Sequence, residues 1–95
     1  MLTSKNRSLL RKLSHDLPLS LIVGKDGLGE GVSKSLAEAL KAHELIKVKC
    51  LPSGEKSALT VGEELSKSTQ SDLVDVVGHV IILYKRNPEH PVIVL

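Results

Sequence analysis

Aromatic residues are almost absent from this sequence. It contains one tyrosine and no tryptophan or phenylalanine, so its hydrophobic core must be built from leucine, valine, isoleucine and alanine. One class of nucleic-acid-binding domain stacks bases on several aromatic rings of a sheet. The shortage of aromatic residues excludes that mode of recognition.

Cysteine is equally scarce, and long hydrophobic runs are missing. Cys50 is the only cysteine, so no disulfide can form within the chain, and this usage fits a reducing compartment. No apolar run approaches the roughly 18 residues that a membrane-spanning helix needs. The basic N-terminus is not followed by the apolar segment of a secretory signal. It faintly resembles an organelle transit peptide, but a basic helix of the domain is the simpler interpretation, and we expect a cytoplasmic protein with no membrane partner.

The 95 residues predict one domain, and their charge is unevenly distributed. The first 50 residues hold nine Lys and Arg against five Asp and Glu, whereas the remainder holds four against six. Such asymmetry is typical of a protein with a polyanionic partner on one face. Chance scatter of solvated charges explains the asymmetry equally well when it is taken alone.

Hydrophobic periodicity predicts helices and strands in the order αβαβαββ. Because strands joined through helices pair in parallel and a tight hairpin pairs antiparallel, we expect an α/β domain with a mixed four-stranded sheet and helices packed on it. The hairpin turn is Gly78-His79. The predicted elements are a helix from Thr3 or Ser4 to about His15, a strand at 19–23, a helix at about 30–43, a strand at 44–51, a helix capped by Ser53, and strands at 73–77 and 80–84.

Side-chain patterns predict which faces are buried. In the first helix one apolar side is formed by Leu2, Leu9, Leu10 and Leu13. In the second strand Ile46, Val48 and Cys50 point one way, while Lys47 and Lys49 point the other. The tail, residues 87–95, has two prolines and an apolar end, and it is a candidate edge strand.

A glycine-rich stretch between the first strand and the second helix, residues 23–32, holds four of the seven glycines. A P-loop would need lysine where Glu30 stands, and a dinucleotide fingerprint would need glycine where Val32 stands. What remains is G-x-x-G, formed by Gly24, Lys25, Asp26 and Gly27. Two glycines let a ligand backbone approach closely, and the following helix N-terminus and the lysine favour an anion. Alone, the motif also fits a simple strand-to-helix turn.

Basic residues elsewhere in the chain favour the phosphate-binding interpretation. They lie on the second strand, after the last strand, and along the first helix. Each is by itself an ordinary solvated charge, but together with the loop they predict a surface that follows a phosphate backbone. The residues are Lys47, Lys49, Lys85, Arg86, Arg7, Arg11 and Lys12.

These motifs occur in an order that resembles the CRM domain (chloroplast RNA splicing and ribosome maturation) in its single-domain bacterial, YhbY-type form. The resemblance covers residues 2 to about 86. It is carried by the stretches LRKLSH at 10–15, IVGKDGL at 22–28, AL at 39–40, ELIKVK at 44–49 and VGHVIILYKR at 77–86.

The resemblance implies a compact RNA-binding domain at residues 1–86, followed by the tail at 87–95. Its fold is expected to be similar to the C-terminal domain of bacterial translation initiation factor three. The implied partner is ribosomal RNA in precursors of the large ribosomal subunit, contacted through the loop from Gly24 to Gly27. Asp26 departs from the family by placing an acid in the loop, and Gly29 replaces the usual Thr or Ser cap.

Two other functional classes fit this sequence less well. The four histidines show no metal-ligand spacing, and Cys50 falls on an apolar strand face, so we expect no enzyme, metal, cofactor or small-molecule substrate. A protein-interaction module is the alternative, docking on ribosomal proteins through the apolar tail or through acidic residues of the third helix. These acidic residues are Glu55, Glu63 and Glu64. We expect a monomer that recognises structured RNA mainly by shape and charge.

Overall fold

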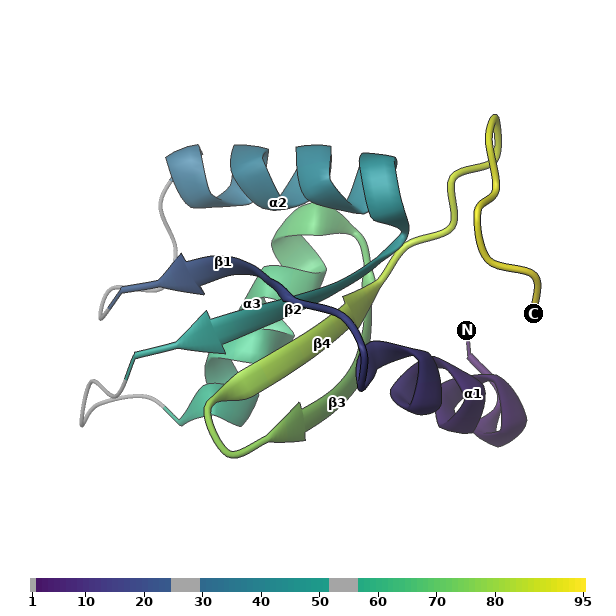
Figure 1. The fold of residues 1–95 in the computed structure, drawn as a ribbon. Coiled ribbons are helices and arrows are strands. Elements are labelled where there is room, and N and C mark those ends of the chain that lie inside the picture. The colour runs from purple at the N-terminus through teal and green to yellow at the C-terminus, as the bar shows by residue number, and fades with distance from the viewer. Residues whose placement is uncertain (1, 25–29, 52–56) are drawn as a thin grey trace.

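The computed structural model describes residues 2–24, 30–51 and 57–95 and contains three helices and four strands in these residues (Figure 1). Their order confirms the predicted αβαβαββ succession. The elements are α1 (Ser4–Ser14), β1 (Leu19–Val23), α2 (Glu30–His43), β2 (Leu45–Cys50), α3 (Ala58–Thr69), β3 (Asp72–Val77) and β4 (Val80–Tyr84).

The strands form one mixed sheet in the order β1-β2-β4-β3. β1 pairs with β2 in parallel, whereas β4 pairs antiparallel with both β2 and β3. The predicted α/β fold with a mixed four-stranded sheet is therefore confirmed. β4 is apolar on both faces, and Ile81 to Tyr84 are all buried, as a strand in the middle of a covered sheet requires.

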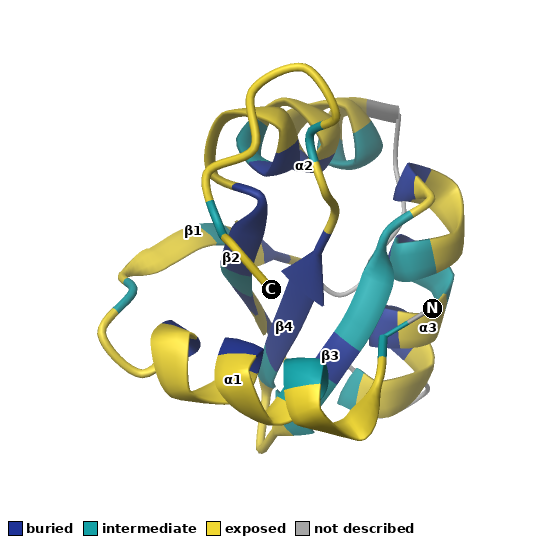
Figure 2. Cartoon of the chain, turned by 90° about the vertical axis from the view of Figure 1, so that its right-hand side faces the viewer, coloured by how far each residue is buried: buried dark blue, intermediate teal, exposed yellow. Residues whose placement is uncertain are grey.

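Each face of the sheet has its own hydrophobic cluster (Figure 2). On one face α2 and α3 bury Leu36, Leu40 and Leu65 against the strands. On the other face Leu10 of α1 packs in a smaller cluster with residues of β2, β3 and β4. The strand residues of this second cluster are Leu45, Val74, Ile82 and Tyr84.

The helix caps agree with the sequence at α1 and differ at α3. Thr3 accepts a hydrogen bond from the backbone N–H of Asn6 and caps α1, as predicted. The prediction that Ser53 caps the third helix is wrong. Ser57 accepts from the backbone N–H of Thr60 and is the cap. Both serines suit the cap chemically, so propensity alone could not place the start of this helix.

α1 buries less of its apolar side than its helical wheel predicts. Leu10 is fully buried, but Leu9 and Leu13 remain 39% and 42% exposed. Ser14 is buried instead, with its hydroxyl donating to the carbonyl of Arg11. The helix lies across one end of the sheet, so only a narrow strip of its surface meets the strands.

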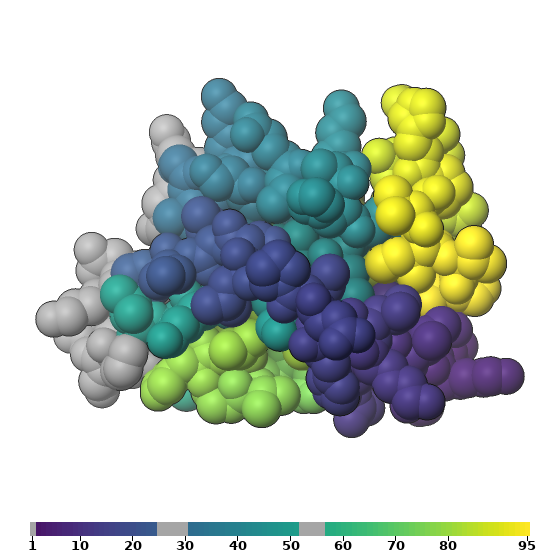
Figure 3. All heavy atoms as spheres, in the orientation of Figure 1, coloured from purple at the N-terminus to yellow at the C-terminus, as the bar shows by residue number. Residues whose placement is uncertain are grey.

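The prediction that the tail forms an edge strand is also wrong. Residues after β4 adopt no strand and pair with none of the four (Figure 1). Instead the tail folds back between the end of α2 and α1, where Ile93 packs against the smaller cluster (Figure 3). Pro88 and Pro91 lack the backbone N–H that a strand ladder needs.

Close packing favours glycine at Gly62 of α3. A Cβ there would lie 3.1 Å from Cδ1 of Leu73 and 3.2 Å from Cγ2 of Ile81. Gly78 is required for a different reason, because its φ of +59° lies in the left-handed region and closes the β3–β4 hairpin. No helix in the described part of the chain is long and apolar enough to cross a membrane.

Candidate nucleic-acid interface

Among the described residues, one end of the sheet face that carries α1 is open. α1 and the tail cover the end at which β4 finishes, whereas no other described helix or tail residue covers the end at which β1 and β2 finish (Figures 1 and 3). We call this surface the open sheet face. Its side chains come from all four strands and include Ile22, Lys47, Lys49, Asp75, Val77 and Val80.

β2 presents both of its lysines on the open sheet face. Ile46, Val48 and Cys50 are buried beneath α2 and α3, so the alternation of a strand turns Lys47 and Lys49 to the opposite side. Lys49 is exposed and Lys47 is half-buried. The predicted basic face of this strand is thus confirmed.

The last turn of α1 borders the same face. Arg11, Ser14 and His15 share a hollow of about 230 Å³ with Lys47 and with residues of β3 and β4. The strand residues lining it are Asp75, Val77, Val80 and Ile82. The hollow therefore brings charges from α1 and β2 together, at Arg11 and Lys47.

Arg11 is partly engaged within this hollow. Its Nε lies 3.8 Å from Oδ2 of Asp75, and both side chains are partly exposed. Such a surface pair contributes little to stability and leaves most of the guanidinium donors available. Lys12, the next residue of α1, is exposed.

Gly24 follows β1 directly at the open end. It is exposed, and a Cβ at this position would meet no atom within 4 Å. Its φ is not one of the positive values that glycine alone tolerates. Among the described residues, neither packing nor a positive φ therefore requires glycine at this position. Lys25, Asp26 and Gly27 lie outside the described residues.

Arg7 links α1 to β3 through hydrogen bonds. Its Nη1 donates to the carbonyl of Leu73 at 2.6 Å and to that of Val74 at 2.9 Å. These carbonyls belong to the part of β3 where the register with β4 shifts, between Leu73 and Asp75. The guanidinium therefore donates to two backbone carbonyls at this irregularity of the strand.

Arg7→Ala is expected to lower the free energy of unfolding by about 1–2 kcal/mol, because two half-buried carbonyls lose a charged donor. Urea unfolding measures this loss. Lys5→Ala, at an exposed position of the same helix, is the matched control and should change stability by less than about 0.5 kcal/mol. Equal effects of the two substitutions would contradict a structural role for Arg7.

Lys85 and Arg86 lie at the opposite end of the sheet. β4 pairs Val80 with Lys49 and Tyr84 with Leu45, so four residues, or about 14 Å of strand, separate the two ends. Nζ of Lys85 donates to the carbonyl of Thr69 at 3.0 Å, near the end of α3. The structure thus separates Lys85 and Arg86 from the open sheet face.

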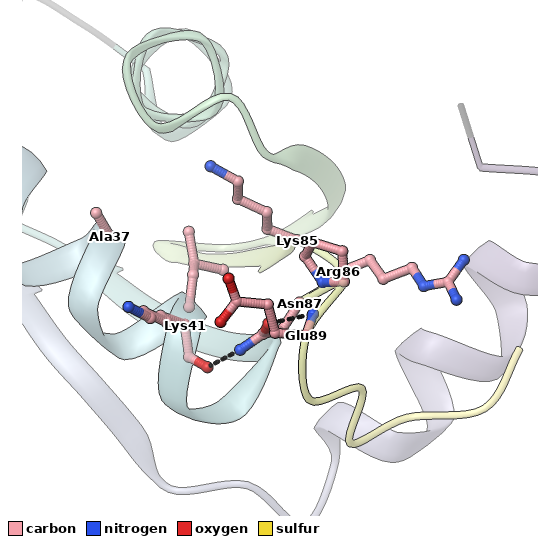
Figure 4. Close-up of a pocket in the computed structure, with 8 residues that line it drawn as sticks. Ala37, Lys41, Lys85, Arg86, Asn87 and Glu89 are labelled. Atoms are coloured by element: carbon pink, nitrogen blue, oxygen red, sulfur yellow. Dashed lines mark hydrogen bonds between the residues drawn. The ribbon is translucent and has the colours of Figure 1, made fainter.

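A second hollow, of about 330 Å³, lies beside these two residues (Figure 4). It is lined by the end of α2 and by the start of the tail, including Lys41 and Glu89. Figure 4 shows Lys85 and Arg86 extending away from each other, while the Asn87 amide donates to the carbonyl of Lys41 at 3.1 Å. The positive charges diverge, so this hollow does not form one anion site.

Glu44 is a buried charged residue that the sequence analysis did not single out. It is fully buried and has a φ of +63°, directly after α2. Its carboxylate accepts three hydrogen bonds of 2.6 Å from tail backbone N–H groups, those of Asn87, Val92 and Ile93. Only the folded tail brings these donors to it, so no local pattern could have shown the contact.

The surroundings of Glu44 favour its charged form. Burial by itself would raise the pKa of Glu44, but the three backbone N–H donors and the positive charge of Arg86 lower it below its ordinary value. Burial is also the largest cause that raises the pKa of Tyr84, and the charge of Glu44 adds to it. Glu44 is therefore a structural anion that ties the tail to the domain.

The described residues contain no group of three or more His, Cys, Asp or Glu side chains placed to hold a metal ion. Cys50 is buried, as predicted for a core residue. That the protein has no catalytic activity and no cofactor stays a prediction.

Comparisons with known proteins agree on one family. The family model described as "CRS1 / YhbY (CRM) domain" matches residues 2–85. "Probable RNA-binding protein YqeI" of Bacillus subtilis is 42% identical over 90 residues, covering 95% of this chain and 94% of the relative. "Probable RNA-binding protein PA4753" of Pseudomonas aeruginosa is 36% identical over 88 residues, covering 93% and 85%.

A solved structure extends this likeness to three dimensions. The solution structure of SAV1595 from Staphylococcus aureus is 35% identical and superposes with a TM-score of 0.76. The match covers 94% of this chain and 96% of that protein. The agreement therefore spans the whole α/β domain.

Proposed function

Because the chain belongs to the family of CRS1 / YhbY (CRM) domains, we propose that it is a non-enzymatic RNA-binding protein. Its partner is ribosomal RNA, and its binding assists assembly of the large ribosomal subunit in the cytoplasm. The names of the relatives support RNA as the partner. The ribosomal role rests on the resemblance of the sequence to YhbY-type proteins.

The observation that carries the proposal is the gathering of basic groups on the open sheet face. Lys49 pairs with Ile22, two residues before Gly24, while Lys47 pairs with Leu19 at the start of β1 and shares a hollow with Arg11 of α1. The G-x-x-G loop and the N-terminus of α2 clamp a backbone phosphate, and these side chains extend the contact along the strand.

The remaining basic residues have secondary roles in this proposal. Lys12 adds charge beside Arg11, whereas Lys85 and Arg86 contact RNA that extends to the far end of the domain. Arg7 contributes through the fold, since its guanidinium is bonded to β3. The protein acts as a monomer.

The alternative function, docking on ribosomal proteins through the apolar tail, has less support. Glu44 binds the tail backbone at three positions, and Ile93 packs against the domain. A tail fixed in this way is a poor candidate for a free docking arm.

Salt dependence tests the proposal. Fluorescence anisotropy with a structured ribosomal RNA fragment should give a slope of log affinity against log salt of about −2 to −4, as expected for roughly three to five phosphate contacts. Lys49→Ala should reduce the slope by about 1. Gly24→Asp should weaken binding by roughly tenfold, because it adds bulk and negative charge where the RNA backbone approaches.

Lys67→Ala is the matched control for the lysine, since Lys67 is exposed on α3, beneath the other face of the sheet. It should leave both affinity and slope unchanged. Binding without a salt slope, or equal effects of Lys49→Ala and Lys67→Ala, would reject the open sheet face as the RNA contact.

A further inference from the structure

One transverse row of the open sheet face is apolar at three of its four positions. Ile22 pairs with Lys49, Lys49 pairs with Val80, and Val80 pairs with Val77. Directly paired residues point to the same side of a sheet, so these four side chains form a line across all four strands. We call this line the aliphatic row. With strands about 4.8 Å apart, it is about 14 Å wide.

The aliphatic row is exposed to solvent, unlike the apolar residues further along β4. Ile22 is 59% exposed and Val77 is 62% exposed, whereas the next residues of β4, from Ile81 on, are buried. Isolated exposed aliphatic residues are common on protein surfaces. Here Ile22 and Val77 lie on either side of Lys49 and the half-buried Val80, on one surface near Gly24.

The composition of the row indicates the chemistry of its ligand. A double-stranded RNA presents phosphates and 2′-hydroxyl groups to a protein, and its base faces are stacked inside. Unpaired bases can instead be turned outward, where aromatic or other apolar side chains cover their flat faces. A row of aliphatic side chains that includes Lys49 and lies beside Lys47 therefore suits an unpaired strand, whose bases contact the row while its phosphates contact Lys47 and Lys49.

The central lysine disfavours a protein as the ligand. Lysine is depleted in the cores of protein interfaces, because its charge must be desolvated there. A second copy of this chain facing the row would bring two sets of these lysines together, which is unfavourable. The phosphates of an unpaired strand supply the complementary charge.

We infer that the aliphatic row binds the bases of an unpaired RNA segment, so that the ligand of this protein is RNA with a single-stranded stretch beside a helical region. The inference rests on the proposed RNA-binding function and adds to it the class of RNA. It also adds Ile22, Val77 and Val80 as contact residues that the basic pattern did not include.

Two RNA probes and one pair of substitutions test this inference. The first probe is a hairpin with an unpaired tail of about six nucleotides, longer than the four that a G-x-x-G module clamps. The second is the same hairpin with its tail paired to a complementary strand. The variant Ile22→Thr/Val77→Thr keeps β-branched side chains and net charge while removing apolar surface.

We expect wild type to prefer the unpaired tail, and the variant to lose on the order of tenfold in affinity for it, since each methyl or methylene group is worth about fourfold. The salt slope of the variant should equal that of wild type, because no phosphate contact is removed. Val92→Thr/Val94→Thr, at exposed positions of the tail, is the matched control and should bind as wild type does.

The outcomes separate this inference from the proposed function. Equal binding of both probes by wild type and by a folded Ile22→Thr/Val77→Thr variant, with a normal salt slope, overturns the inference and leaves RNA binding intact. A loss of affinity for both probes alike also overturns it. A wild-type dimer that this variant abolishes without changing RNA affinity would assign the row to a second copy. Absence of any salt-dependent RNA binding would reject the proposed function itself.

Discussion

Replacing Lys47 and Lys49 together by glutamate is expected to weaken RNA binding on the order of 100-fold at roughly 100 mM salt. Each lysine lost from a phosphate contact costs about tenfold at low salt, and the new carboxylates add repulsion. Both side chains face the open sheet face and not the core beneath α2 and α3, so the fold should tolerate the change. Anisotropy over a salt series measures the loss, which should shrink as salt rises.

A control variant with the same net charge separates position from overall charge. Lys5→Glu/Lys67→Glu changes the net charge by the same amount, at exposed positions in the first turn of α1 and the last turn of α3. It should weaken binding by only a few-fold through the general field of the protein. Equal losses in the two double variants, both folded by circular dichroism, would mean that net charge and not the open sheet face governs binding.

Glu44→Ala is expected to lower the free energy of unfolding by about 2–4 kcal/mol. The substitution leaves the N–H groups of Asn87, Val92 and Ile93 without their charged acceptor. The tail can release these groups to water, but it then removes Ile93 from the cluster beneath α1. Urea unfolding measures the loss of stability, and hydrogen exchange at the Val92 and Ile93 amides reports release of the tail.

Two further substitutions define the origin of this effect. Glu44→Gly removes the same carboxylate but relaxes the left-handed backbone, so it should be less destabilising than Glu44→Ala by about 1 kcal/mol. Glu38→Ala, at an exposed position of α2, should be close to neutral. If the Val92 and Ile93 amides stay protected in Glu44→Ala, the carboxylate does not hold the tail.

The same carboxylate makes stability depend on pH in the acid range. Hydrogen bonds to the tail lower the pKa of Glu44 in the folded protein below its ordinary value of 4.5, so the unfolded chain takes up this proton first. The stabilisation is complete above pH 4.5 and is lost as the pH falls through the lower, folded value. Glu44→Gln should therefore show a flatter decline in stability below pH 4.5 than wild type, and parallel curves would contradict this.

The sequence by itself determined the order of the elements and the sheet type. Alternation in β2, the two-sided apolar run of β4 and the Gly78-His79 turn are local patterns, and each reports a backbone conformation or a buried face directly. The family followed from motifs spread over most of the chain, and the comparisons confirm it. Lys47 and Lys49 were correctly placed on one face because the two-residue period of a strand requires it.

Only the tertiary structure decided which distant groups meet. It joined Arg11 to Lys47, moved Lys85 and Arg86 to the other end of the sheet, and bonded Arg7 to the bulge in β3. It also aligned Ile22 with Val77 and closed the tail over Glu44. These contacts depend on the strand order β1-β2-β4-β3, which places side by side strands that are far apart in the sequence. Local periodicity records which way a side chain points, but its partner is determined by how the elements pack.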